Sequence, residues 1–462
     1  MNDIPEKLQI QGGGTHKSVG QELDRVDGRL KVTGAARYSA EVRLKNLAHA
    51  VVVGSTIARG RVREIDISRA ERVPGVLAVL THWNAPKLKP TDVFNPGVVG
   101  EGPPPAAATS VSPLQDDEVF HYGQEIACVI AETLEQAEYA ASLVRNTYDA
   151  QTPEADFDKA LWAAETPETV WGRPPAETHG DPDRALAEAA IKVDAIYTTP
   201  FEHHNPMEPH ATTALWQGDS LTVYDSSRYV HGVRQMLAEQ FGLDPRRVRV
   251  ISQFIGGSFG SKGAVRAHVP LAAMCARHVR RPVKLVLSRR QMFEMTGHRP
   301  ATRQRVALGT TNKGILITVI HEGASTCSAT DPFVEPFTLQ TLHLYASEHR
   351  RVKQEIVRLN APQPTPMRAP GEASGMFVLE SAMDELAYRL KMDPIALRRI
   401  NEPPTEPVTG KPFSNRKLLA CLDKGALAFG WARRSPVPRS MQDGRLLIGM
   451  GVAAAVYPLK GK

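Results

Sequence analysis

The chain has 462 residues, 42% of them hydrophobic and 23% charged, which is typical of a globular protein able to bury several cores. Its net charge of +6 is interspersed with acids rather than gathered into a basic stripe, which argues against nucleic acid as a partner. No window reaches the roughly 18 apolar residues of a membrane span and the N-terminus has no apolar signal core, so we expect a cytoplasmic protein without a membrane partner.

The first third of the chain predicts a tail followed by one compact α/β domain. Residues 1–28 have no periodic apolar pattern and are expected to be flexible, and the domain is expected over 29–150. Its elements are strands at 48–53, 76–80 and 126–131, helices at 66–73 and 134–144, and a proline- and glycine-rich loop at 86–113. The buried face of the second helix is expected to comprise Leu134, Ala137, Ala141 and Val144.

A linker and a second domain are expected next. Residues 151–195 are acidic and alanine-rich and predict a linker with one helix over 182–190. The second domain is expected over 196–440. Its elements are a strand pair around 214–216 and 221–223, a helix at 230–241 that stops at Gly242, and a helix at 375–390 with a buried stripe of Leu379, Met383, Leu386 and Leu390.

A glycine-rich stretch over residues 256–263 organises this domain. It lies between a strand pattern at 248–251 and a helical pattern through 265–275, and a second strand pattern follows at 283–287, as in a βαβ unit. Gly256, Gly257 and Gly260 would let the backbone approach a ligand, with N–H groups converging on something electron-rich. A tight turn without a ligand does not need the bulky side chain of Phe259, so this residue favours a loop that forms the wall of a ligand pocket. The order of Ser261, Lys262 and Gly263 excludes a phosphate-binding P-loop.

Other candidate sites remain open or are disfavoured by their spacing. The cluster of His203, His204, Glu208 and His210 suggests zinc, but Pro206 and Pro209 prevent the helix on which such ligands would share a face. Arg368 lies between prolines just before a helix, where it is either an anion-binding group or a surface arginine.

The four cysteines form no CxxC pair, which argues against an iron–sulfur or zinc centre in this chain and favours a reducing compartment. The residues alone therefore predict a ligand-binding α/β protein with an anion-friendly pocket.

Several motifs in a fixed order carry a family resemblance. They are Asp27-Gly28, Lys31 to Gly34, Pro74-Gly75-Val76, Pro206-Met207-Glu208-Pro209, Gly256 to Lys262, Arg368-Ala369-Pro370-Gly371, and Glu380 with Asp384-Glu385. In this order the chain resembles the large, molybdenum-cofactor-binding subunit of the xanthine dehydrogenase and aldehyde oxidoreductase family. The resemblance implies an N-terminal hammerhead α/β domain and then a molybdopterin-binding α/β domain, an α+β or α/β fold class. It also implies that residues 441–462 are the first strand of an incomplete second cofactor-binding domain.

The resemblance implies a cofactor site and a reaction. Gly256, Gly257 and Gly260 would place backbone amides against the metal's ligands, Phe259 would face the substrate, and Arg368 would lie by the cofactor. The pterin, in a dinucleotide form, would hold molybdenum without side-chain ligands. The implied reaction is oxidative hydroxylation of a small molecule, an aldehyde or an N-heterocycle, with water as the oxygen source. Electrons would pass to iron–sulfur and FAD partner subunits.

Three departures from the family pattern limit the inference. Arg228 follows Ser227 where a glutamine is usual, which leaves its cofactor contact open, and Gly263 stands where purine-oxidising members carry a carboxylate. The family's glutamate base would lie beyond Lys462, so no catalytic residue is assigned. The apolar run from Leu446 to Leu459 would need neighbouring strands, and we expect the isolated chain to fold poorly and to be inactive. The alternatives are a catalytically silent scaffold or partial subunit, and an unrelated nucleotide-binding module.

Overall fold

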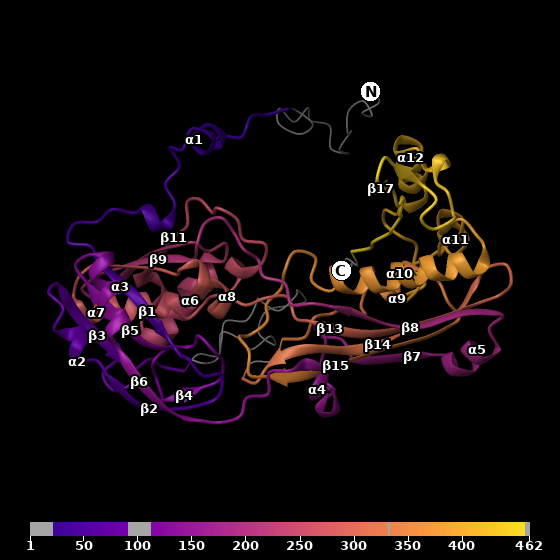
Figure 1. Ribbon diagram of the computed structural model, residues 1–462. Coiled ribbons are helices and arrows are strands. Elements are labelled where there is room, and N and C mark those ends of the chain that lie inside the picture. Colours follow the sequence, from indigo (N-terminus) through magenta and orange to yellow (C-terminus); the bar gives the residue numbers. More distant parts are fainter. Residues whose placement is uncertain (1–21, 91–111, 331–332, 458–462) are drawn as a thin grey trace.

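The computed structural model describes residues 22–90, 112–330 and 333–457. Figure 1 shows two lobes side by side, one around a seven-stranded sheet and the other around a five-stranded sheet. The expected tail lies outside the described residues as far as residue 21, and so does most of the expected loop at 86–113. Helix α1 (Gly28–Val32) begins where the tail was expected to end. Within the described residues, no helix combines the length and apolar composition that a membrane span requires.

The seven-stranded sheet joins strands from two distant parts of the sequence. Its order is β11-β10-β9-β12-β1-β5-β3. The strands are β1 (Ala48–Gly54), β3 (Val76–Thr81), β5 (Glu125–Ala131), β9 (Ala211–Gln217), β10 (Ser220–Asp225), β11 (Val248–Ile251) and β12 (Val283–Val286). Strand β1 pairs in parallel with β12, Ala48 opposite Val283. The strands expected within a separate domain at 29–150 thus continue the sheet of the following domain, because β1 has apolar faces and needs neighbours at both edges.

A three-stranded sheet and two helices complete this N-terminal region. The sheet contains β2 (Gly60–Asp66), β4 (Glu118–Val119) and β6 (Arg145–Ala150), and the helices are α2 (Ser68–Glu71) and α3 (Leu134–Leu143). The expected face of α3 is wrong in part: Ala137 and Ala140 are buried, whereas Leu134 is 40% exposed. Thr133 caps this helix in a capping box, so Leu134 is its first residue and lies at the rim of the contact.

The βαβ unit around the glycine-rich stretch is confirmed. Strands β11 and β12 run in the same direction in one sheet, with β10 and β9 between them, and α7 (His268–Val279) connects them. Helices α6 (Val230–Phe241) and α8 (Arg289–Met295) pack in the same lobe. Helix α6 ends, as expected, at Gly242 with φ +65°.

The five-stranded sheet has the order β7-β15-β14-β13-β8. The strands are β7 (Ala176–His179), β8 (Ile191–Thr199), β13 (Thr302–Thr310), β14 (Leu316–Ser328) and β15 (His349–Leu359). Helix α10 (Glu372–Leu390) covers one face, and α4 (Phe157–Ala160) and α5 (Pro182–Glu188) lie against the other (Figure 1). The expected linker at 151–195 is therefore part of this lobe, since β7 pairs with β15.

The buried stripe of α10 is confirmed for Leu379, Met383 and Leu386, which pack on β8, β13 and β14. Leu390 is only partly buried at the helix end. Helices α9 (Thr341–Leu344), α11 (Pro394–Ile400) and α12 (Leu418–Phe429) complete this lobe.

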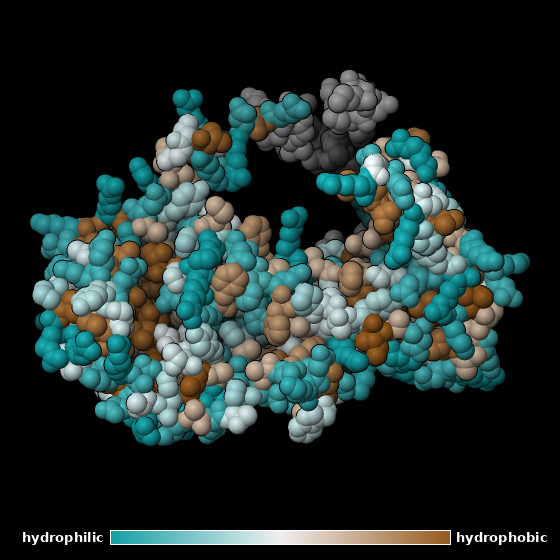
Figure 2. Space-filling model, viewed as in Figure 1, coloured by the Kyte–Doolittle hydropathy of each residue, from teal (hydrophilic) through white to brown (hydrophobic). Residues whose placement is uncertain are grey.

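The C-terminal segment differs from the strand expected within residues 441–462. A short hairpin of β16 (Gln442–Asp443) and β17 (Leu446–Leu447) replaces it, and Leu446 is 61% exposed. Figure 2 shows hydrophobic side chains among hydrophilic ones where Figure 1 places α12 and β17. The hairpin contains only two residue pairs and ends at Leu447. The residues that follow lie against α10 instead of continuing the strand. There the N–H of Ala454 donates to Glu380 Oε2 at 2.6 Å. The end of the apolar run, at residues 458–459, lies outside the described residues.

A buried histidine on β14 gives a prediction for acid stability. The ring nitrogens of His321 lie 2.7 Å from Thr341 Oγ1 and 2.8 Å from Gln304 Oε1, and burial lowers the pKa of His321 to about 3. The unfolded chain binds this proton near pH 6.5 and the folded chain does not, so folded stability is lost as the pH falls below 6.5. We expect His321→Gln to reduce the loss of unfolding free energy between pH 7 and pH 4.5 by about 2–3 kcal/mol.

Urea unfolding at both pH values measures this difference. His278→Gln, at an exposed position of α7, is the control and should leave it unchanged. If His321→Gln lost as much unfolding free energy between pH 7 and pH 4.5 as the parent protein, the role of this imidazole would be contradicted.

Candidate functional site

The candidate site centres on residues 256–263, here called the glycine loop, which connects β11 to α7. Positive φ angles occur at Gly257 (+97°), Phe259 (+55°) and Gly260 (+130°). A positive φ at phenylalanine is rare and persists only where the surroundings hold it. Phe259 is 48% exposed.

A buried ion pair fixes one side of the glycine loop. Lys262 Nζ donates to Glu208 Oε2 at 2.6 Å and to the Glu208 carbonyl at 2.9 Å. The N–H of Gly256 donates to the same carboxylate oxygen at 2.8 Å. Both charged side chains are buried, and each compensates the charge of the other, which would cost free energy to bury without a partner. Sequence reasoning considered Glu208 as a metal ligand, Lys262 for a P-loop and both as parts of family motifs, but it did not pair them. The available signal was the position of Lys262 among glycines ahead of a buried helix, because a lysine that becomes buried there requires a charged partner.

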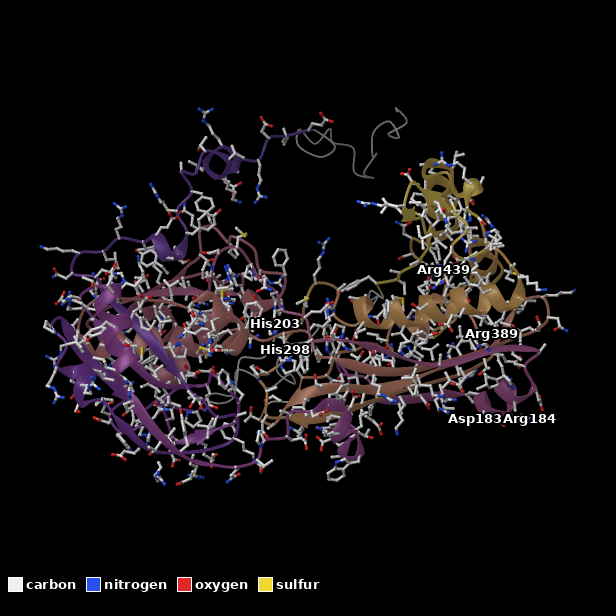
Figure 3. The ribbon with its side chains drawn as sticks, viewed as in Figure 1. Asp183, Arg184, His203, His298, Arg389 and Arg439 are labelled. Carbon is white, nitrogen blue, oxygen red and sulfur yellow. The ribbon has the colours of Figure 1, made fainter. Side chains whose placement is uncertain are left out.

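The histidines near Glu208 do not form a metal site. Over the described ranges, no group of three or more His, Cys, Asp and Glu side chains is placed to hold a metal ion. His204 Nε2 lies 3.1 Å from the carbonyl oxygen of Pro366, and burial lowers the pKa of His204 to about 4. The rings of His203 and His298, labelled in Figure 3, lie 5.7 Å apart where the two lobes meet. These imidazoles thus belong to the packing of the lobe junction.

The other side of the glycine loop contacts residues 366–371, here called the arginine segment. The N–H of Arg368 donates to the Phe259 carbonyl at 2.8 Å. A Cβ added to Gly260 would lie 1.7 Å from the carbonyl oxygen of Pro366, and one added to Gly256 would lie 2.6 Å from Glu208 Cβ. Contact within the chain therefore requires glycine at both positions, in addition to the approach of a ligand that the sequence predicts.

Arg228 and Gly263, two of the departures from the family pattern, lie against each other. The N–H of Arg228 donates to the Lys262 carbonyl at 3.0 Å. A Cβ on Gly263 would lie 2.9 Å from Arg228 Nε, so the missing side chain at 263 leaves room for the guanidinium group. The structure thus brings together all six candidate cofactor-binding residues, with Arg228 and Arg368 both hydrogen-bonded to the glycine loop.

The available donors suit a negatively charged ligand. Arg228 and Arg368 are exposed, and their guanidinium groups make no hydrogen bond or ion pair with any described residue. Ser258 Oγ is buried in the same loop without a described hydrogen-bond partner. Guanidinium groups bind phosphate and other oxyanions in a bidentate manner. A phosphate-bearing ligand therefore fits the residues around the glycine loop.

Comparison with protein families gives two matches that together cover most of the chain. Residues 33–152 match the aldehyde oxidase and xanthine dehydrogenase a/b hammerhead domain. Residues 164–402 match the molybdopterin cofactor-binding domain. Both the glycine loop and the arginine segment lie in the second match.

Three curated relatives cover most of this chain. PaoC of Escherichia coli K12, an aldehyde oxidoreductase molybdenum-binding subunit, is 39% identical over 447 residues, 95% of this chain and 58% of that protein. A xanthine dehydrogenase molybdenum-binding subunit of Escherichia coli O157:H7 is 29% identical over 445 residues, 94% of this chain and 58% of that protein. The nicotinate dehydrogenase large molybdopterin subunit of Eubacterium barkeri is 26% identical, with 84% of this chain and 90% of that protein covered. The chain thus spans a little over half the length of the two Escherichia coli relatives.

Solved structures agree on the fold. Quinoline 2-oxidoreductase from Pseudomonas putida 86 superposes with a TM-score of 0.78 at 20% identity, covering 90% of this chain and 55% of that one. Aldehyde oxidoreductase from Desulfovibrio gigas superposes with a TM-score of 0.75 at 24% identity, covering 89% and 47%.

Proposed function

The chain belongs to the molybdenum-cofactor-binding subunits of the aldehyde oxidoreductase and xanthine dehydrogenase family, and from this premise we propose that its glycine loop and arginine segment hold molybdopterin for oxidative hydroxylation. The expected fold, a hammerhead domain followed by a molybdopterin-binding domain, is confirmed by both family matches. One observation carries the proposal: Arg228 and Arg368 are each fixed to the glycine loop by a backbone hydrogen bond, while neither guanidinium group has a hydrogen-bond or ion-pair partner among the described residues.

Each residue of the site has a role in this proposal. The cofactor, when bound, supplies the two-electron oxidation and the transfer of oxygen from water. Arg228 and Arg368 hold its negative charge, in the pterin's phosphate or its dinucleotide form. Gly256, Gly257 and Gly260 bring the backbone close, and Phe259 orients the substrate. Neither the glycine loop nor the arginine segment contains a carboxylate, so neither supplies the general base.

The substrate class that we propose is an aldehyde or an N-heterocycle. PaoC is an aldehyde oxidoreductase subunit, and the Eubacterium barkeri relative is a nicotinate dehydrogenase subunit. Gly263 has no carboxylate with which to bind a purine.

Electrons from this reaction would pass to iron–sulfur and FAD groups on partner chains, in our proposal. The Escherichia coli relatives are named as molybdenum-binding subunits, which implies further subunits in those proteins. Of the cysteines here, Cys128, Cys275 and Cys327 are buried and Cys421 is exposed. Cys128 and Cys275 contact each other across β5 and α7, with 3.6 Å between the sulfur atoms.

Cofactor content and oxidation assays test the proposal. We expect the gene product, purified with its associated chains, to contain molybdenum and pterin and to oxidise benzaldehyde or nicotinate with an artificial electron acceptor. Arg368→Ala and Arg228→Gln should each lower the pterin retained by about tenfold or more, because each removes a charge-assisted contact of about 1.5–3 kcal/mol.

Arg234→Gln, on the exposed face of α6, is the matched control and should retain the pterin of the parent. A protein without molybdenum or pterin would favour the silent scaffold. A loaded and active protein that both variants leave unchanged would remove these two arginines from the cofactor site.

A further inference from the structure

The arginine segment has an unusual backbone that something must hold in place. Ala369 has φ +61° and Gly371 has φ +83°, on either side of a proline and immediately before α10. A non-glycine residue with positive φ persists where its surroundings determine the conformation. Two buried charged residues, Arg299 and Glu335, hydrogen-bond to the backbone of this segment at residues 368–371.

Arg299 binds two carbonyl groups of the arginine segment. Its Nη2 donates to the Arg368 carbonyl at 2.8 Å and its Nη1 to the Ala369 carbonyl at 3.2 Å. Its Nε donates to Glu202 Oε2 at 2.9 Å, and the backbones of Arg299 and Glu202 form a two-residue bridge. The planar guanidinium group is thus oriented from two sides, with 5% of the side chain exposed.

Glu335 completes the contact from the other side. Its Oε1 accepts from Arg299 Nη1 at 3.1 Å and from the N–H of Gly371 at 2.7 Å, and its side chain is fully buried. The Arg299–Glu335 pair therefore holds three backbone groups within four consecutive residues. Glu335 Oε2, by contrast, has no described hydrogen-bond partner.

We infer that the buried Arg299–Glu335 pair is a positioning device for Arg368. The pair fixes the carbonyls of Arg368 and Ala369 and the N–H of Gly371, while the N–H of Arg368 is fixed by Phe259. The backbone of Arg368 is therefore held on both sides, and its exposed guanidinium group projects from a rigid base toward the ligand of the glycine loop. This inference rests on the proposed cofactor site, since Arg368 acts on the cofactor and Arg299 acts through Arg368.

Two substitutions separate positioning from simple stability. Arg299→Lys keeps the charge but loses the fork that spans two carbonyls. Glu335→Gln keeps Oε1 as an acceptor and replaces only the atom without a partner. We expect Arg299→Lys to lower pterin and molybdenum retention about tenfold, as is typical when a residue behind a ligand-binding group is changed. Glu335→Gln should stay within about twofold of the parent.

The control is Arg398→Lys, which weakens another buried Arg–Glu pair in the same lobe without touching the arginine segment. It should lower the thermal midpoint at least as much as Arg299→Lys and retain the cofactor. Hydrogen exchange measured by mass spectrometry should rise at residues 366–371 in Arg299→Lys and stay unchanged there in Arg398→Lys.

A double substitution completes the experiment. Arg299→Lys combined with Arg368→Ala should retain as much pterin as Arg368→Ala alone, because both act through one guanidinium group. Additive losses, or unchanged exchange at 366–371 in Arg299→Lys, would overturn the inference. If Arg368→Ala retains the cofactor while exchange at 366–371 still rises in Arg299→Lys, the segment is held as inferred and the cofactor assignment fails instead.

Discussion

Valine in place of Gly260 should separate the glycine loop from the arginine segment and abolish cofactor binding. The new Cβ would lie 1.7 Å from the Pro366 carbonyl oxygen and 3.0 Å from His204 Nε2, at a φ of +130° that β-branched residues do not adopt. Relief requires the two loops to move apart, which breaks the hydrogen bond from Arg368 to Phe259. We expect a loss of about 3 kcal/mol or more in unfolding free energy and no bound pterin.

Urea unfolding and pterin content measure both consequences. Gly449→Val is the matched control, because a Cβ at Gly449 meets nothing within 4 Å. Gly257→Val should be milder than Gly260→Val, since the nearest atom to its Cβ is Pro206 Cβ at 3.1 Å. Normal stability in Gly260→Val would contradict the loop contact. Normal pterin in a destabilised Gly260→Val would leave that contact standing and contradict the placement of the cofactor.

Methionine in place of Arg398 should cause the other large effect, in the second lobe. Arg398 is fully buried, and it donates to Glu380 Oε2 at 2.8 Å and to Asp384 Oδ1 at 2.9 Å. Glu380 also accepts from Tyr345 Oη at 2.7 Å and from the N–H of Ala454 at 2.6 Å. Without the guanidinium group a buried carboxylate is left uncompensated, which costs about 3–5 kcal/mol. The C-terminal segment should then detach from α10.

Urea unfolding and limited proteolysis within residues 441–457 measure the two parts of this prediction. The double variant Glu380→Gln/Arg398→Met should recover much of the stability, because it removes the buried charge and keeps a hydrogen-bond acceptor. Arg399→Met, at an exposed neighbouring position, should cost less than about 1 kcal/mol. A similarly small loss in Arg398→Met would show that this pair does not hold the segment.

Local features of the fold could be predicted from the sequence because their signals are local. The hairpin that turns at Gly218, the end of α6 at Gly242 and the βαβ unit around the glycine loop all depend on residues close in sequence. The pairing of β1 with β12 joins residues far apart and leaves no such signal. Strand β7 falls within the predicted linker because four polar and small residues at a sheet edge have no strand pattern.

The residues of the candidate site likewise divide into those that sequence signals identify and those that depend on contacts between distant segments. Composition and motif order identified the glycine loop and Arg368, and the structure brings them into contact. The charged pairs behind them were missed, because Glu208 and Lys262, or Arg299 and Glu335, are buried partners only after two loops meet. Glu380 was noted only as part of a motif, and its partner Arg398 follows one helix later. A buried charge requires a partner, but sequence alone does not show which charges become buried.

The shared seven-stranded sheet also sets an order of events during synthesis on the ribosome. Ala48 of β1 pairs with Val283 of β12, 235 positions later in the chain. At the usual rate of about 5–20 residues per second, translation of that interval takes on the order of 10–50 seconds. Throughout it, β1 has β5 at one edge at most and an open edge at the other. Open edges of apolar strands pair readily with other chains, so the nascent hammerhead region is exposed to such pairing until β12 emerges.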